Sequence, residues 1–271
     1  MKPNTKFMAF AAMMGLTATV SAGNFNINTH LGSFSGGATD AVKATVDYDG
    51  PAGPLPAGVY VIKPRTDGND WYLPDIVFVE SGATLIIEPG TTIYADFNKG
   101  ADLVSKTDDT YGAILVARGG KMIAEGTATS PIVITSVAER DGLPVGDANA
   151  GQAPVPGRDG GKWGGIVLLG NAPLTARDGS GNIIRETKIE GFAANESDSR
   201  VLYGPAANPA QPEESSGVLK YMSLRYGGYE FATGSEINGL TMGAIGRGTR
   251  IENIEVVSNT DDAFEWFGGT V

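Results

Sequence analysis

Short apolar runs separated by glycine-containing turns recur along this chain of 271 residues. The segments Ile76–Gly90 and Ala113–Gly126 each hold two apolar runs around a turn, and Gly82 and Gly119 take equivalent places 37 residues apart. A strand-and-turn unit that returns without a helical period between its copies is typical of a solenoid built from strands. The hydrophobic pattern therefore predicts a coiled β-structure.

The remaining apolar runs also have the length of strands, and each ends near Gly, Pro, Asn or Asp. Several alternate between apolar and polar residues, as Ile254-Glu255-Val256 does, so that one face can be buried and the other solvated. Beyond the first 22 residues no stretch of roughly twelve residues has apolar positions at helical spacing, which predicts an all-β fold. The predicted strands are Val59–Ile62, Ile76–Val79, Leu85–Ile87, Thr92–Tyr94, Ala113–Val116, Ile132–Thr135, Ile166–Leu169, Leu219–Arg225, Leu240–Met242 and Ile251–Val257.

The turns decide between parallel coils and antiparallel sheets, because both arrangements produce short strands. A β-sandwich joins its strand pairs by tight Asn-Gly or Asp-Gly hairpins at short intervals, and such dipeptides are not regularly placed here. The pattern favours a right-handed, single-stranded parallel β-helix, with a β-sandwich as the alternative. The insertions expected as loops on the side of the coil are Asp96–Thr110, Ala138–Gly161 and Arg177–Gly217.

The first 22 residues have the pattern of a secretory signal peptide. Lys2 and Lys6 carry positive charge, Phe7–Val20 is apolar, and the small residues Val20-Ser21-Ala22 precede an expected cleavage site before Gly23. The apolar stretch of 14 residues is shorter than the roughly 20 that span a bilayer as a helix, although an uncleaved anchor is the alternative. We expect a secreted or cell-surface protein with no transmembrane span after the signal is removed.

The signal peptide is followed by a polar segment and then by the regular pattern. Residues 23–70 are rich in Gly, Thr, Asn and Asp and include the cluster Pro51–Gly58. A solenoid exposes core side chains and unpaired backbone groups at an open end, so this segment is expected to be an N-terminal cap. The predicted organisation is a signal peptide over 1–22, a cap over 23–70 and a β-helix domain over 71–271.

Composition and charge exclude several classes of function. The formal net charge is −11 and becomes −13 once the two lysines of the leader are removed, which opposes binding to nucleic acid or anionic lipid. The chain has no cysteine, so disulfides and Cys–His catalysis are excluded. His30 is the single histidine and lies in the predicted cap, which leaves a Ser-His-Asp triad or a histidine-based zinc site unsupported.

Three long motifs carry a resemblance to a known family. Trp163–Pro173 (WGGIVLLGNAP), Glu236–Gly246 (EINGLTMGAIG) and Ser258–Val271 (SNTDDAFEWFGGTV) are similar to segments of secreted bacterial surface proteins with a pectate-lyase-like right-handed β-helix. The resemblance implies fold and export rather than a particular activity. In that family the last motif continues into further coils, so we expect a sequence truncated at Val271, whose open coil would associate end to end with another molecule.

Charged residues near the end of the chain provide candidates for catalysis and metal binding. Asp261 and Asp262 follow an Asn-Thr pair as in β-helical polysaccharide hydrolases, where two carboxylates act as acid and base. A lyase would instead use a base such as Lys220 or Arg225, with Ca²⁺ between an acidic sugar and protein carboxylates. We expect a weak calcium site at Asp261, Asp262 and Glu265, the alternative being that these residues are solvated.

Aromatic residues gather in the same part of the chain and suggest carbohydrate contact. Tyr226, Tyr229 and Trp266 are the candidates, because exposed aromatic faces on a flat sheet stack against sugar rings, whereas inward packing is the alternative. The sequence thus predicts an exported, non-catalytic β-helix protein for adhesion, matrix assembly or carbohydrate contact, with an extracellular glycan or a surface protein as partner. A polysaccharide lyase or glycoside hydrolase is the alternative.

Overall fold

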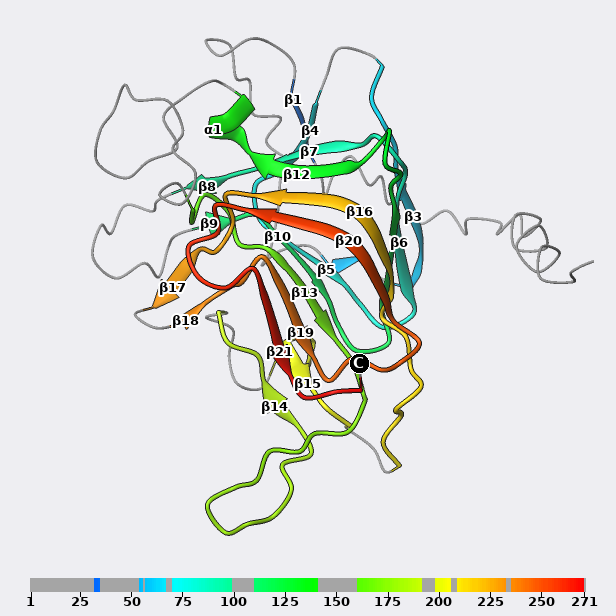
Figure 1. Ribbon diagram of the computed structural model, residues 1–271, viewed down its shortest axis with the longest axis vertical. Coiled ribbons are helices and arrows are strands. Elements are labelled where there is room, and N and C mark those ends of the chain that lie inside the picture. Colours follow the sequence, from blue (N-terminus) through cyan, green and yellow to red (C-terminus); the bar gives the residue numbers. More distant parts are fainter. Residues whose placement is uncertain are drawn as a thin grey trace, which may run out of the picture.

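The protein consists mainly of short parallel strands that wind into stacked coils (Figure 1). The leader, His30 and most of the predicted cap lie outside the residues described by the computed structural model. The described residues are 32–34, 54–55, 57–66, 70–98, 110–140, 160–191, 198–205, 209–232 and 235–270.

The strands form two main sheets, and each coil passes from the first sheet to the second. The first sheet consists of β2 (Pro54–Leu55), β5 (Ile76–Val79), β10 (Ala113–Val116), β13 (Ile166–Leu169), β19 (Leu240–Gly243) and β21 (Phe264–Phe267), all parallel. The second sheet consists of β3 (Gly58–Ile62), β4 (Asp70–Leu73), β6 (Ala83–Ile87), β7 (Thr92–Ala95), β11 (Lys121–Glu125), β12 (Ile132–Ser136), β16 (Gly217–Arg225) and β20 (Arg250–Val257), with β1 (Gly32–Phe34) antiparallel to β4.

Parallel pairing confirms the predicted β-helix and makes the alternative β-sandwich wrong. Val116 of β10 lies opposite Val79 of β5 on one side and Leu168 of β13 on the other, in parallel register. We expect the coil to be right-handed, because connections between parallel strands of a sheet generally are.

The predicted repeat of 37 residues is confirmed by the register of two coils. Val79 pairs with Val116, and the turn glycines Gly82 and Gly119 stack, with the Gly82 amide donating to the Gly119 carbonyl over 3.0 Å. Both glycines have a positive φ, 82° and 81°, which a side chain with a Cβ adopts only at an energetic cost. The glycine spacing seen in the sequence is therefore the spacing of stacked left-handed turns.

In the later coils one bent strand takes the place of the two separate strands that each earlier coil contributes to the second sheet. The N-terminal part of β16 pairs with β11 and its C-terminal part with β12, and β20 follows β16 along its whole length. The bends lie at Tyr221 and Asn253, whose φ values are 47° and 55°. Figure 1 shows β16 and β20 as long curved strands that turn around the edge of the coil. These two bends make the second sheet continuous.

The first sheet is buried on both faces, which explains its unbroken apolar runs. Ile114 and Val116 face the interior of the coil, whereas Ala113 and Leu115 belong to a second core on the outer face. That outer face is covered by the insert, defined as the described residues 170–191, 198–205 and 209–216 between β13 and β16. The insert contributes Leu174, Ile189, Val201 and Tyr203 to this second core.

The insert is fixed to the first sheet by two arginines as well as by apolar contacts. Arg118 pairs with Glu186 and donates to the Gly204 carbonyl over 3.0 Å. Arg200 lies 4.1 Å above the ring of Phe78 and pairs with the neighbouring Asp198. A segment predicted as a surface loop is thus a packed cover.

Coil stacking begins inside the segment predicted as a cap, because β2, β3 and β4 pair with the strands of the next coil. The boundary expected at Trp71 therefore falls within the first described coil.

No helix in the described part of the chain is long and apolar enough to cross a membrane. The short elements are α1 (Val137–Arg140), η2 (Ser199–Val201) and the antiparallel pairs β8 (Phe97–Asn98) with β9 (Thr110–Tyr111), β14 (Thr187–Lys188) with β15 (Leu202–Tyr203), and β17 (Glu230–Ala232) with β18 (Ser235–Glu236).

Candidate functional site

One row of side chains on the outer face of the first sheet changes from apolar to polar toward the last described coil. The row runs in register through Phe78, Leu115, Val167, Thr241 and Glu265. The first three of these side chains belong to the second core, where apolar residues are expected. A hydroxyl and then a carboxyl group in the same row mark the outer face of β19 and β21 as a candidate site.

Glu265 of β21 forms a carboxyl pair with Glu190, which follows the buried Ile189 in the insert. Burial is the largest cause that raises the pKa of Glu265, and the hydrogen bond and charge of Glu190 and the charges of Asp262 and Asp261 raise it further, to about 7. Two carboxyl groups in contact cannot both ionise without repulsion, so the contact with Glu190 favours the protonated form of Glu265.

Two buried polar side chains border this pair. Asn238 is fully buried and its Nδ2 donates to Oε2 of Glu265. Thr241 is 2% exposed and lies directly opposite Glu265 in the sheet. Within the described part of the chain neither Oδ1 of Asn238 nor Oγ1 of Thr241 has a hydrogen-bond partner. Buried polar atoms without a partner are uncommon and call for an explanation.

Further carboxylates surround the pair. The pKa of Glu236 is raised first by burial and then by the charges of Asp261, Glu230 and Glu190. The neighbouring charges that raise these two pKa values are all negative, so they destabilise the ionised forms of Glu236 and Glu265. We call this group of side chains the acidic cluster, and its members are Glu190, Glu230, Glu236, Asp261, Asp262 and Glu265.

Lys220 and Arg225, the predicted bases, form ion pairs on other parts of the coil. Nζ of Lys220 lies 3.7 Å from Oε2 of Glu252 on the neighbouring strand β20. Nη1 of Arg225 lies 3.3 Å from Oε1 of Glu139, and its Nε donates to Ser223. Each predicted base is therefore engaged with a glutamate other than the two aspartates of the lyase hypothesis, Asp261 and Asp262.

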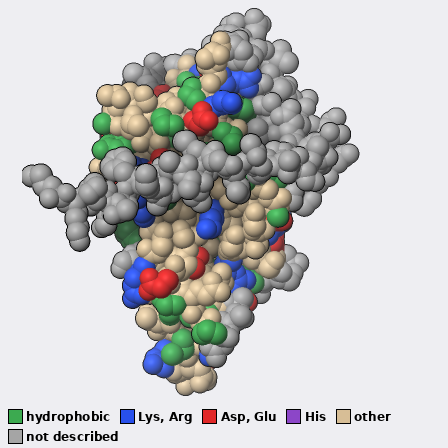
Figure 2. Space-filling view, turned by 90° about the vertical axis from the view of Figure 1, so that its right-hand side faces the viewer, with side chains coloured by type: hydrophobic (Ala, Val, Ile, Leu, Met, Phe, Trp, Pro, Cys, Tyr) green, Lys and Arg blue, Asp and Glu red, His purple; other side chains and the backbone are tan. Residues whose placement is uncertain are grey.

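The charges near Lys220 belong to a mixed surface. Glu125, Lys220 and Glu252 follow one another in register across β11, β16 and β20, and Arg250 pairs with Glu252 over 2.6 Å. Figure 2 shows acidic and basic side chains interspersed on the side where the second sheet bends, with no large patch of one sign. This surface has the composition of an ordinary solvated face.

The expected calcium site receives no support from this geometry. Asp261 and Asp262 are exposed, while Glu265 is engaged with Glu190 and Asn238. Among the described residues no group of three or more His, Cys, Asp or Glu side chains is arranged to hold a metal ion. Calcium binding by Asp261, Asp262 and Glu265 stays a prediction.

Of the three aromatic candidates, only Trp266 is exposed. Tyr226 and Tyr229 are buried, with 9% and 5% of their surface accessible. The Tyr229 ring lies 4.6 Å from that of Tyr111 and 4.8 Å from that of Phe97, centre to centre, so it packs inside the protein. The burial of both tyrosines agrees with inward packing, the alternative to glycan contact. Trp266 is 53% exposed.

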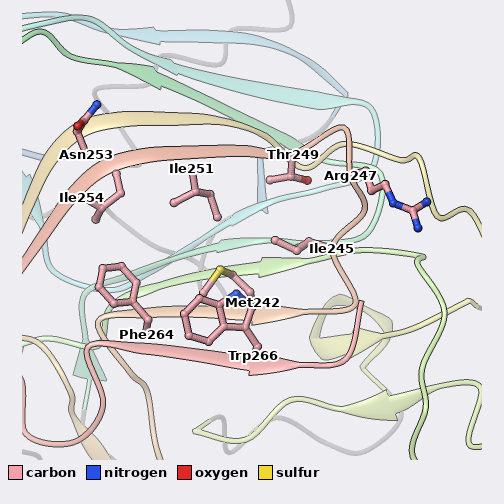
Figure 3. Close-up of a pocket in the computed structure, with 9 residues that line it drawn as sticks. All are labelled: Met242, Ile245, Arg247, Thr249, Ile251, Asn253, Ile254, Phe264 and Trp266. Atoms are coloured by element: carbon pink, nitrogen blue, oxygen red, sulfur yellow. The ribbon is translucent and has the colours of Figure 1, made fainter. Parts of the chain in front are cut away.

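Trp266 stands in register with Met242, in the row that faces the coil interior, and borders an apolar groove of about 480 Å³ between β20 and β21 at the edge of the last described coil. Figure 3 shows Ile251 and Ile254 pointing from β20 toward Phe264 and Trp266 on β21, with Met242 beside the indole. The rings of Phe264 and Trp266 are 6.2 Å apart and inclined by 28°. The residues that line the groove are Met242, Ile245, Arg247, Thr249, Ile251, Asn253, Ile254, Phe264 and Trp266.

Parallel sheets wound into successive coils define the chain as a β-helix protein. The model of the pectate-lyase-like beta helix domain matches residues 65–271, and the chain therefore belongs to this family. No curated protein and no solved structure matches the chain. The family accounts for the fold, while the acidic cluster and the groove have to be interpreted from their own chemistry.

Glu190 and Asn238 are the site residues that sequence reasoning missed. Glu190 lies in a long insertion without strand periodicity, so nothing in the local pattern placed it near Glu265. In the sequence Asn238 has the pattern of an Asn-Gly turn. Its place directly before the apolar strand β19 is the feature that could have indicated a buried polar residue. The contact of Glu190 with Glu265 depends on the fold of the insert across the first sheet.

Proposed function

We propose that this chain is an exported extracellular β-helix protein that contacts a glycan without chemical turnover. Export is supported by the leader, with Lys2 and Lys6 before an apolar stretch and small residues before Gly23. The observation that carries the glycan proposal is the exposed indole of Trp266 at the apolar groove.

The groove combines the two features that sugar recognition needs. Trp266 and Phe264 offer broad apolar faces, and such faces pack against the C–H faces of a sugar ring. Thr249 and Arg247, which also pairs with Glu213, add polar groups that can hydrogen-bond to hydroxyls, whereas Figure 3 shows Asn253 turned away from the two rings. A volume of about 480 Å³ lies in the range of small-ligand sites.

Replacing Trp266 by alanine is expected to weaken glycan binding by about tenfold or more, because the stacking face and its apolar area are lost. Binding is measured by calorimetry with the glycan that gives the strongest signal on an array. Ile183→Ala is the matched control, since Ile183 is 55% exposed on the insert and lies outside the groove. Folded wild-type protein that binds no glycan on the array contradicts the proposal.

A carbohydrate-active enzyme is the second candidate, favoured by the pairing of Glu190 with Glu265. A carboxyl group whose pKa is raised to about 7 can act as a general acid or base near neutral pH. Two carboxyl groups of this kind can serve hydrolysis of a glycosidic bond, although a ligand would have to separate them first.

The enzyme hypothesis predicts products that disappear in Glu265→Gln. Acidic and neutral polysaccharides are incubated with the protein, and unsaturated products are followed by ultraviolet absorbance and new reducing ends by a colour reaction. Glu125→Gln on β11 is the control for loss of a carboxylate elsewhere. Equal product formation by wild type and Glu265→Gln would show that Glu265 does not take part in the reaction. If no polysaccharide gives products, the non-catalytic proposal stands.

A further inference from the structure

We infer that the acidic cluster binds the primary ammonium group of an amino sugar. The cluster brings carboxylates of the insert, Glu190, and of β21, Glu265, into contact. Two buried polar side chains, Asn238 and Thr241, border the cluster, and each has an oxygen that has no hydrogen-bond partner among the described residues. These two oxygens are the observation that distinguishes the cluster from a chance gathering of acids.

The orientation of both side chains directs them into the cluster. The amide of Asn238 is turned toward Glu265, since its Nδ2 donates to Oε2 of that residue. Leu240 and Met242 face the interior of the coil, so Thr241 between them projects to the outer face, directly opposite Glu265. Oδ1 of Asn238 and Oγ1 of Thr241 therefore lie beside the carboxyl pair.

A site rich in acceptors and negative charge requires a cationic ligand with several donors. Ionised carboxylates and the amide oxygen only accept hydrogen bonds, and an ammonium group supplies three donors with a positive charge. An ammonium placed between Glu190 and Glu265 replaces carboxyl repulsion by attraction and provides charge-assisted hydrogen bonds. A single metal ion is a less suitable ligand, because among the described residues no group of three or more His, Cys, Asp or Glu side chains is placed to hold one.

An amino sugar suits the cluster better than a simple amine does. Its hydroxyls are additional donors, and Asp261, Asp262 and Glu236 provide further acceptors around the pair. The inference does not rest on the Trp266 groove, since Glu265 and Trp266 are consecutive residues of β21 and project to opposite faces of the strand. The two sites can therefore be tested separately.

Calorimetry at pH 7 with a glucosamine tetramer and an N-acetylglucosamine tetramer tests the inference, because the two probes differ only in the acetylation of the amino groups, which removes their positive charge. We expect the glucosamine tetramer to bind with an affinity about tenfold or more above that of the acetylated one. Binding is expected to weaken as salt is raised. Glu265→Gln and Glu190→Gln should each lower the affinity about tenfold, whereas Glu125→Gln and Trp266→Ala should not.

Three results would overturn the inference. The first is equal binding of the two tetramers, and the second is unchanged affinity in both folded Glu190 and Glu265 variants. The third is equal binding of a lysine amide, which would show that the ammonium alone is recognised and not the sugar. Circular dichroism checks that each variant is folded. Loss of glucosamine binding in Trp266→Ala would instead place the sugar in the groove and support the proposed function without the acidic cluster.

Discussion

Replacing Gly217 by alanine is expected to lower the free energy of unfolding by about 3–5 kcal/mol, or to prevent folding. Gly217 begins β16 with a φ of 123°, and a Cβ at this position would lie 1.9 Å from the carbonyl oxygen of Met122. Met122 is the register partner of Gly217 on β11, so backbone rather than a flexible side chain blocks the added methyl group. The coils would have to separate at this point.

Alanine variants at two other glycines distinguish the destabilisation caused by this clash from that caused by backbone strain. Gly181 has a φ of 83° with no atom within 4 Å of an added Cβ, so Gly181→Ala is expected to cost about 1–2 kcal/mol through strain alone. Gly179 also has open space and no positive φ, and Gly179→Ala should be nearly neutral. Urea denaturation of the three variants measures the differences. A Gly217→Ala variant no less stable than Gly181→Ala would disprove the close approach of β16 and β11.

The stability of the protein is expected to fall as pH rises from about 4.5 to about 7, because of Glu265. Its pKa is about 7 in the folded protein against an ordinary value of 4.5, so between these values the folded state holds a proton that the unfolded state has lost. The state that binds more protons is favoured at lower pH, and folding stability therefore decreases as pH increases. The groups that face Glu265 are Glu190, Asp261, Asp262 and Asn238.

The effect is measured as the free energy of unfolding in urea at several pH values. Because Glu265 is partly exposed, solvent screening reduces the contribution, and we expect about 1–2 kcal/mol across this window. Glu265→Gln removes the titrating group and should flatten this part of the profile, while Glu125→Gln should keep it. A Glu265→Gln variant with the slope of the wild type would show that other groups cause it.

The fold was largely predictable from the sequence because the two faces of each strand leave a local pattern. Ala113–Val116 and Ile166–Leu169 are apolar at every position, and the structure buries them on both faces. Gly82 and Gly119 marked the stacked turns correctly. The short strands β14, β15, β17 and β18 were not predicted, because two or three residues carry too little periodicity to be recognised.

The candidate site was only partly predictable, because its members come from distant segments. Glu265 was identified from the motif near the end of the chain, but its partner Glu190 lies 75 residues earlier in an insertion without a pattern. Tyr229 looked like a surface aromatic until the structure placed it against Tyr111. Lys220 looked like a base until Glu252 was found beside it. Charge and ring type are visible in the sequence, whereas partners and exposure are not.

The sequence by itself determined the parallel coil, since short strands, turn glycines at a fixed spacing and apolar runs are local properties of the chain. Only the tertiary structure decided that the insert folds across the outer face of the first sheet and brings Glu190 to Glu265. That contact depends on how the apolar residues of the insert, such as Ile189 and Val201, pack on the sheet. Packing between segments far apart in the chain leaves no periodic trace in either one, which is why the carboxyl pair was found only in the folded molecule.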